Sequence, residues 1–144
     1  MGKDGCPTQL LMKKCVSRKT IERFHCKILQ SQSRQISIGI VDRKRQERFQ
    51  KSYNSGNAVC YYGRTGRLRY GDNDGKYRWK SEGNGFFDNE VVTVEVNLIA
   101  GNIKWLINNK LKTSINLMML EDENREFVPY IELEDRGDMV EWFI

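Results

Sequence analysis

The sequence has a single histidine, His25, and only two prolines among its 144 residues. One histidine is too few for the usual zinc patterns, and it leaves any Ser-His or Cys-His catalytic pair dependent on that residue alone. The glycine-rich phosphate loops of P-loop and dinucleotide-binding proteins are missing as well. We therefore expect a protein that is not an enzyme and that holds no cofactor or metal.

Long hydrophobic runs are also missing, since no segment approaches the roughly 20 apolar residues that a membrane helix needs. Residues 1–7 lack the apolar stretch of a secretory signal, and the chain has no Asn-x-Ser/Thr acceptor. These absences predict an intracellular protein, cytoplasmic or nuclear, that does not contact a membrane. We interpret the four cysteines as reduced, mostly packed thiols, with two disulfides as the weaker alternative: Cys6, Cys15, Cys26 and Cys60.

Charge is divided unevenly along the chain. Residues 1–80 contain 19 Lys+Arg and 6 Asp+Glu (+13), whereas residues 81–144 contain 5 and 13 (−8), which together give the net charge of +5. One interpretation is a basic face that attracts an acidic partner. In the other, the two halves lie side by side in one domain and largely neutralise each other.

Alternating apolar residues indicate β-strands rather than helices. The clearest strand is 91–98, whose apolar residues fall on one face: Val92, Val94, Val96 and Leu98. A turn at 100–102 leads into 103–107, whose apolar residues also share a face: Ile103, Trp105 and Ile107. The two segments together predict an antiparallel hairpin.

Further strands are expected along the rest of the chain: 24–29 and 35–41, a pair joined across the polar stretch 30–34; 58–62 and 68–70; and 127–133 and 139–144, which flank the turn 134–138. Pro129 predicts that its strand lies at a sheet edge or begins near there. Residues 8–20 fit either a strand or a short helix. We expect one domain, with residues 1–20 as an N-terminal extension or first strand and residues 21–144 as an all-β sandwich of two antiparallel sheets.

Four blocks of the sequence, taken in order, resemble those of the SPRY/B30.2 domains, which belong to the concanavalin A-like β-sandwich superfamily. They are a strand that ends in an Ile-Gly-hydrophobic step (35–42), a tyrosine-glycine hairpin (61–71), an aromatic, an acidic turn and two strands closing at an Asn pair (86–109), and a Phe-x-Pro-x-hydrophobic strand (127–133). Two positions depart from the family. Asp88-Asn89-Glu90 stands where the family has Gly-Asp, and Asn108-Asn109 where it has Asn-Gly; because Asn tolerates a left-handed backbone, the second change keeps the turn.

This resemblance implies a jelly-roll sandwich of two curved antiparallel sheets, with loops at one end as a protein- or peptide-recognition surface and no catalytic residues. On that basis we predict a non-catalytic protein–protein interaction module, an adaptor or a subunit of a larger assembly. The expected partner is a protein or peptide, and an acidic partner is one option.

The longest polar segment, 42–57, joins two strands, and such connections carry recognition more often than the scaffold does. In the resembling family this loop borders the binding surface. Arginine forks pair with carboxylates or phosphates, and an exposed tyrosine is a good anchor. We predict a partner-binding set from this loop and the last turn: Arg43, Arg45, Arg48, Tyr53, Asn57, Asp135 and Arg136. The alternative is a solvated basic loop.

Other functions are weaker but stay open. Residues 79–87 faintly resemble the sugar site of galectins, which makes a glycan-binding lectin the second hypothesis, although His25 is not followed by the asparagine and arginine that such sites need. Phosphate or nucleic-acid binding by the basic half is the third, yet the run 61–70 does not match the aromatic motif of RNA-recognition domains, so nucleic acid is the less favoured partner. The carboxylates of 71–75 lack the further ligands of a calcium loop, so we expect a tight Asp-Gly turn there.

Overall fold

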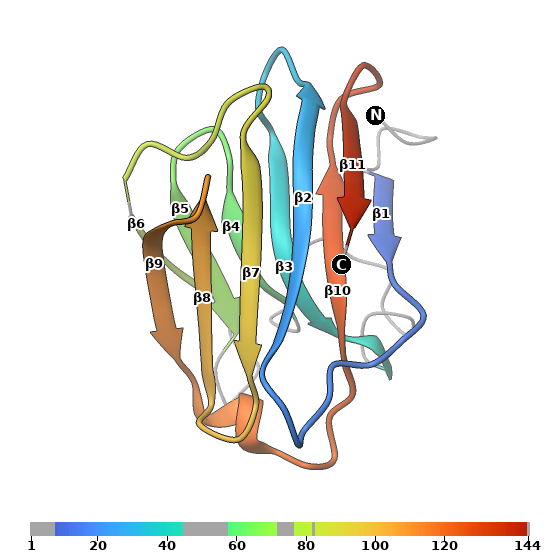
Figure 1. Ribbon diagram of the computed structural model, residues 1–144, viewed down its shortest axis with the longest axis vertical. Helices are drawn as coiled ribbons and strands as arrows, with labels where there is room; N and C mark the ends of the chain where they lie inside the picture. The colour runs from blue at the N-terminus through green and yellow to red at the C-terminus, as the bar shows by residue number, and fades with distance from the viewer. Residues whose placement is uncertain (1–7, 45–57, 72–76, 82, 144) are drawn as a thin grey trace.

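In the computed structural model, residues 8–44, 58–71, 77–81 and 83–143 are described, and they form two antiparallel sheets that pack face to face. Sheet A has the order β1 (Thr8–Leu11), β10 (Phe127–Leu133), β3 (Ile36–Asp42), β4 (Ala58–Tyr62), β5 (Arg67–Gly71) and β6 (Tyr77–Ser81). Sheet B has the order β11 (Met139–Phe143), β2 (Glu22–Gln30), β7 (Val91–Asn97), β8 (Asn102–Ile107) and β9 (Lys110–Asn116), and it lies in front of sheet A in Figure 1. The predicted all-β sandwich is confirmed.

A short 3-10 helix, η3 (Met118–Glu121), follows β9 on the way to β10. Within the described part of the chain, no helix has the length and hydrophobicity of a membrane span.

The main core lies between the two sheets, and the hairpin β7–β8 supplies much of it. The inward residues that the alternation predicted are buried: Val92, Val94, Val96, Leu98, Ile103, Trp105 and Ile107. Asn108 and Asn109 connect β8 to β9 with φ of 51° and 67°, so both adopt the left-handed backbone that a tight hairpin turn requires. The Asn pair therefore replaces Asn-Gly without loss of the turn.

Among the consecutive strands that lie in different sheets, two pairs matter for the site. Strand β2 lies in sheet B and β3 in sheet A, while β10 lies in sheet A and β11 in sheet B. The connections 31–35 and 134–138 therefore cross from one layer to the other, and both do so at the same end of the sandwich, at the top of Figure 1. Alternation within a strand marks its two faces but does not assign the strand to a layer, because that depends on partners far away in the sequence.

The expectation that Pro129 marks a sheet edge is wrong, because β10 is an interior strand between β1 and β3. The alternative, a strand that begins near Pro129, is confirmed, since β10 begins at Phe127. The carbonyl oxygen of Pro129 accepts a hydrogen bond of 3.1 Å from the backbone N–H of Met12, which follows β1. The N and C=O of one strand residue point to the same side, so the N–H that proline lacks would have pointed towards β1 and away from β3. Proline therefore removes no hydrogen bond of the β10–β3 ladder. On the other side, β1 has ended at Leu11, one residue before Met12.

Sheet A is buried on both faces around β3, whose seven residues are all buried. A second, smaller apolar cluster lies on its outer face: Val41, Ala58, Cys60, Val128 and Tyr130. Burial raises the pKa of the Cys26 thiol, in the main core, to about 12, and it raises the pKa of Cys60 well above its ordinary value. Both sulfurs are therefore packed as neutral thiols.

Candidate functional site

The structure separates the residues that the sequence analysis combined into one binding set. Arg43 directly follows β3 and Asp135 follows β10 within two residues. These strands are antiparallel neighbours whose register pairs Asp42 with Phe127 and Ile36 with Leu133. Seven strand residues span roughly 20 Å, so Arg43 lies at one end of the sandwich and Asp135 and Arg136 at the other. We call these the Arg43 end and the Asp135 end.

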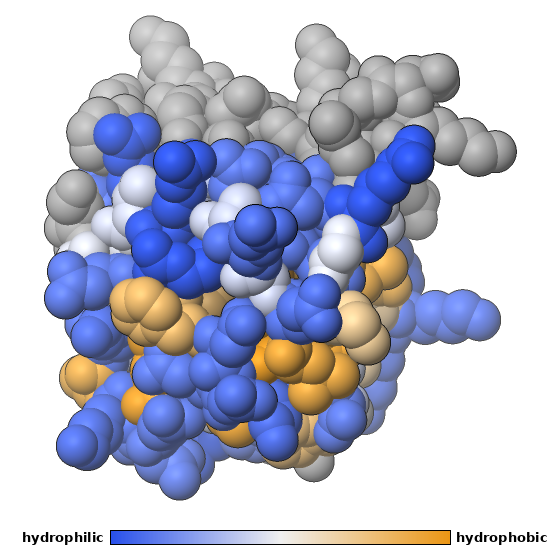
Figure 2. Space-filling model, turned by 90° about the horizontal axis from the view of Figure 1, so that it is seen from above, coloured by the Kyte–Doolittle hydropathy of each residue, from blue (hydrophilic) through white to orange (hydrophobic). Residues whose placement is uncertain are grey.

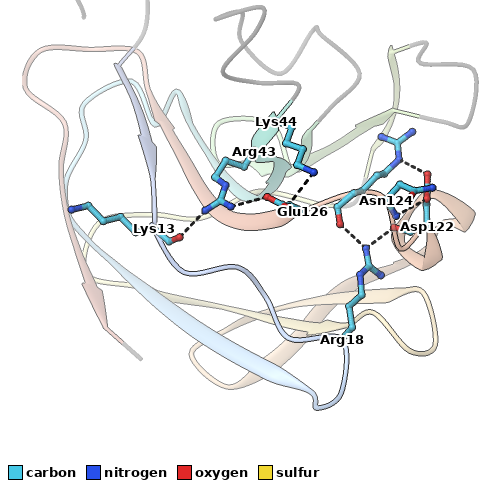
Figure 3. A network of polar contacts seen from close by, with 8 residues as sticks. Lys13, Arg18, Arg43, Lys44, Asp122, Asn124 and Glu126 are labelled. Atoms are coloured by element: carbon cyan, nitrogen blue, oxygen red, sulfur yellow. Dashed lines mark hydrogen bonds and ion pairs between the residues drawn. The ribbon is translucent and has the colours of Figure 1, made fainter.

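At the Arg43 end, the guanidinium of Arg43 is engaged within the chain. It donates hydrogen bonds to the carbonyl oxygen of Lys13 (3.0 Å) and to Glu126 Oε2 (2.7 Å), and Lys44 Nζ lies 3.2 Å from Glu126 Oε1 (Figure 3). These two cations hold the pKa of Glu126 below its ordinary value. The other loop residues of the predicted set lie outside the described residues, where their role stays a prediction: Arg45, Arg48, Tyr53 and Asn57.

Arg18 stabilises the Arg43 end through hydrogen bonds to the backbone. Its guanidinium donates to the carbonyl oxygens of Leu120 (3.0 Å), Asp122 (2.6 Å) and Arg125 (2.9 Å), so one side chain holds the segment between η3 and β10 (Figure 3). Arg125 lies 3.8 Å from Asp42 with both side chains almost fully buried. These contacts join residues 1–80 to residues 81–144, and the neutralisation of basic residues by carboxylates is seen instead in the pairs of Arg43 and Lys44 with Glu126.

At the Asp135 end, the two crossover connections hydrogen-bond to each other. Ser31 Oγ donates to Asp138 Oδ1 (2.8 Å), Ser33 Oγ donates to Asp135 Oδ2, and the Asp135 N–H donates to Asp138 Oδ2 (3.1 Å). A polar pocket of about 360 Å³ opens beside them, lined by Gln30, Gln32, Ser33, Asp135, Gly137 and Asp138. Arg136, the other predicted residue of this turn, is exposed.

The same end carries an aromatic residue that the sequence analysis did not select for protein binding. Phe86 is fully buried, with its ring centroid 6.2 Å from that of Tyr61, whereas the next residue, Phe87, is 51% exposed. The guanidinium carbon of Arg34 lies 4.2 Å from the centroid of the Phe87 ring, a cation–π contact. The pair Phe86-Phe87 could have indicated this exposed ring. Neighbouring side chains of an extended chain point in opposite directions, so when one ring is buried the next is directed to the surface.

Close backbone packing fixes this aromatic loop. Gly85 has φ of 76°, and a Cβ there would lie 1.8 Å from the carbonyl oxygen of Gly63, which accepts the N–H of Phe86 at 3.1 Å. Only glycine fits such an approach. The β4–β5 turn therefore holds the loop in the position that buries Phe86 and presents Phe87.

Further exposed apolar side chains lie nearby at the ends of β2 and β11. Met139 is paired in register with Gln30, and both Met139 and Leu29 are exposed. Figure 2, which looks onto this end, shows apolar patches among polar residues in the half that lies over sheet B. The Asp135 end thus combines apolar anchors, a stacked arginine and a polar pocket.

The run 79–87, which faintly resembles a galectin sugar site, is described except for Glu82. Trp79 lies on edge strand β6 in register with Arg69. The turn expected at 71–75 lies outside the described residues apart from Gly71. Trp105 belongs to the core, as expected for a large aromatic residue. Among the described residues, no group of three His, Cys, Asp or Glu side chains is arranged to hold a metal ion.

Comparison with known proteins gives a clear answer for the fold alone. No family model and no curated protein sequence matches the chain significantly. The crystal structure of the SPRY domain of human HERC1 superposes with a TM-score of 0.75 at 13% identity, covering 96% of this chain and 82% of that one. A second human SPRY domain gives a TM-score of 0.74 at 16% identity, covering 98% and 86%.

The chain therefore has the fold of SPRY domains, which confirms the resemblance that four short blocks of sequence indicated. At this level of identity the likeness describes the architecture.

Proposed function

We propose that this protein is a non-catalytic interaction domain that recognises a peptide or a partner subunit through the loops at the Asp135 end. The observation that carries the proposal is the half-exposed ring of Phe87, which stacks against the guanidinium of Arg34. Its neighbour Phe86 is buried, and a polar pocket lies at the same end of the sandwich. Aromatic and arginine side chains dominate the binding energy of protein interfaces, and a preordered anchor loses little entropy on binding.

The buried groups of the chain support a role without catalysis. The only histidine of the sequence, His25, hydrogen-bonds through Nδ1 to Thr93 Oγ1 (2.7 Å) and stacks on Phe143 with ring centroids 5.1 Å apart. Cys26 and Cys60 have pKa values raised by burial, so neither supplies a thiolate nucleophile. Packed, reduced thiols also fit our proposal that the protein acts inside the cell, as an adaptor or a subunit of an assembly.

The ion pairs between the two halves weigh against nucleic acid as the partner. Arg23 lies 2.6 Å from Glu95, and Arg43 and Lys44 both contact Glu126. Phosphate-binding surfaces need cations that stay available for counterion exchange. These three basic residues of the first half instead interact with carboxylates of the second.

Affinity capture from a native extract with the tagged full chain tests the proposal. We expect Phe87→Ser and Arg34→Glu each to reduce recovery of the wild-type partner at least tenfold, as loss of a hot spot does. Met118→Ser is the matched control, because Met118 is an apolar residue at the opposite end with 73% exposure.

Unchanged recovery with both loop variants would refute the Asp135 end as the binding surface. A parallel variant with Arg45→Glu and Arg48→Glu tests the predicted loop at the Arg43 end separately. Retention on immobilised glycans that survives Phe87→Ser would instead support the lectin hypothesis.

A further inference from the structure

Arg34 has a backbone conformation that arginine rarely adopts. Its φ is 59°, in the left-handed region that glycine and asparagine enter most readily. Contacts on both sides of the residue enforce this conformation. The N–H of Arg34 donates to Ser31 Oγ (2.9 Å), and its carbonyl oxygen packs so closely on Gly63 that a Cβ there would lie 3.0 Å from it. Strain of this kind is found at ligand-binding positions, where the surrounding structure maintains it.

The side chain of Arg34 lies over an exposed aromatic ring. Its guanidinium carbon is 4.2 Å from the centroid of the Phe87 ring, which is 51% exposed. The ring attracts the positive charge, but it offers no oxygen to the five N–H donors of the guanidinium. Arg34 is partly buried, so the contact orders a side chain that would sample many rotamers if it were fully exposed.

Within the described residues, the guanidinium of Arg34 makes no ion pair and no hydrogen bond. Other arginines with little exposure are engaged: Arg18 donates to three carbonyl oxygens, and Arg43 donates to Glu126. Arg125 lies close to two carboxylates. An ordered guanidinium without an acceptor of its own is complementary to an acceptor on another molecule, and its planar fork fits a carboxylate best.

The carboxylates of the same end already have donors of their own. Asp88 and Asp138 accept the N–H (2.9 Å) and the hydroxyl (2.8 Å) of Ser31. Asp135 accepts the hydroxyl of Ser33. These negative charges repel a doubly charged phosphate more strongly than a singly charged carboxylate, and phosphate sites usually combine several arginines. The ligand that fits one fork in this setting is therefore a single carboxylate, held by two parallel hydrogen bonds.

We propose that Arg34 selects an acidic residue of the partner. Its guanidinium binds the side-chain carboxylate of an aspartate or glutamate, and the exposed ring of Phe87 receives an apolar side chain next to that residue in the partner sequence. This inference rests on the proposed function, because it assigns the chemistry of the partner at the same end of the sandwich. The charge that matters is one ordered arginine rather than the basic half of the chain as a whole.

Peptide binding to the full chain tests the proposal. A phage-displayed library of random 12-residue peptides, selected on the wild-type protein, should yield binders with Asp or Glu beside an apolar residue. Replacing that acid by its amide should weaken a synthetic peptide at least tenfold, and so should Arg34→Gln. The amide peptide should lose little more on Arg34→Gln, because a double-mutant cycle isolates a direct pair. The Arg34 Nε–H resonance should shift when the acidic peptide is added.

Further variants separate the planar fork from charge and from the fold. Arg34→Lys keeps the charge but should not restore binding. Arg64→Gln and Arg136→Gln remove the same charge from exposed positions of the same end, and they should change the affinity less than twofold. Arg34→Gly should unfold at a temperature close to that of the wild type, because relief of the strained φ offsets the lost ring contact. A large drop would show that Arg34 serves the fold and would count against the proposal.

Several results would overturn the proposal. Selected peptides without Asp or Glu would do so, as would peptides that tolerate the amide, and if Phe87→Ser still removed their binding the proposed function would stand. Equal losses in Arg34→Gln, Arg64→Gln and Arg136→Gln would show a general charge effect only. Tighter binding of a phosphoserine peptide than of the glutamate peptide would refute the choice of a carboxylate. A library without binders would refute recognition of a short acidic segment, while capture with Phe87→Ser would still decide the proposed function.

Discussion

The indole Nε1 of Trp105 donates a hydrogen bond of 2.9 Å to the carbonyl oxygen of Ile38, and this bond connects the two sheets. Trp105 belongs to β8 in sheet B and Ile38 to β3 in sheet A, and both residues are fully buried. The contact orients one layer against the other at the centre of the core. It is therefore a specific polar link inside an interface that is otherwise apolar.

Trp105→Phe removes this donor and leaves a buried carbonyl without it. We expect the free energy of unfolding to fall by about 1 to 3 kcal/mol, with a further loss from the smaller ring. Urea unfolding should show a lower midpoint at an unchanged slope. Trp142→Phe, a half-buried tryptophan on an edge strand, should have a smaller effect, and equal effects would contradict the importance of the inter-sheet bond.

Glu132 makes the stability of the fold dependent on pH. It is fully buried on the outer face of sheet A, and burial raises its pKa from 4.5 to about 7, although hydrogen bonds from Tyr130 (3.2 Å) and Gln9 oppose the rise. The folded state thus binds a proton that the unfolded state releases between pH 4.5 and 7. The contribution of Glu132 to the free energy of unfolding is fully present below pH 4.5 and is lost as the pH rises through about 7. This change is on the order of 3 kcal/mol.

Glu132→Gln should remove this dependence, because a neutral amide mimics the protonated carboxyl. Urea unfolding at pH 5, 6, 7 and 8 should show the variant gaining on the wild type as pH rises. Glu123→Gln, at an exposed position, is the control. A constant difference between variant and wild type across this range would show that Glu132 does not titrate there.

Arg18 holds three carbonyl oxygens at once, and we expect Arg18→Ala to destabilise the protein by about 2 kcal/mol. Arg18→Lys should restore little of this, because an ammonium group cannot reproduce the planar fork. Hydrogen exchange should localise the loss to residues 117–126. Lys19→Ala, an exposed neighbour, should leave both measurements unchanged.

Asn109 has φ of 67° in the β8–β9 turn. Asn109→Gly should stabilise the protein by up to about 1 kcal/mol, because glycine adopts this backbone without strain. Asn109→Ala should destabilise it by a similar amount. Thermal unfolding of the three proteins is sufficient, and a destabilising glycine would contradict the assignment of the turn.

Local sequence patterns predicted much of the fold. The alternation in 91–98 and 103–107 predicted which residues of β7 and β8 face the core, because adjacent strands joined by a short turn are determined by neighbouring residues. The order of four short motifs predicted the SPRY-like sandwich that the solved structures confirm.

Only the tertiary structure decided how distant segments meet. The sequence placed Arg43 and Asp135 in one binding set, and the antiparallel register of β3 and β10 separates them. It offered a sheet edge as one position for the strand of Pro129, and the strand order places β10 between β1 and β3. Layer, register and neighbour are set by contacts between residues far apart in the chain, where the burial of whole faces outweighs local preference. The same long-range packing stacked Arg34 on Phe87, a contact that no motif of the sequence contained.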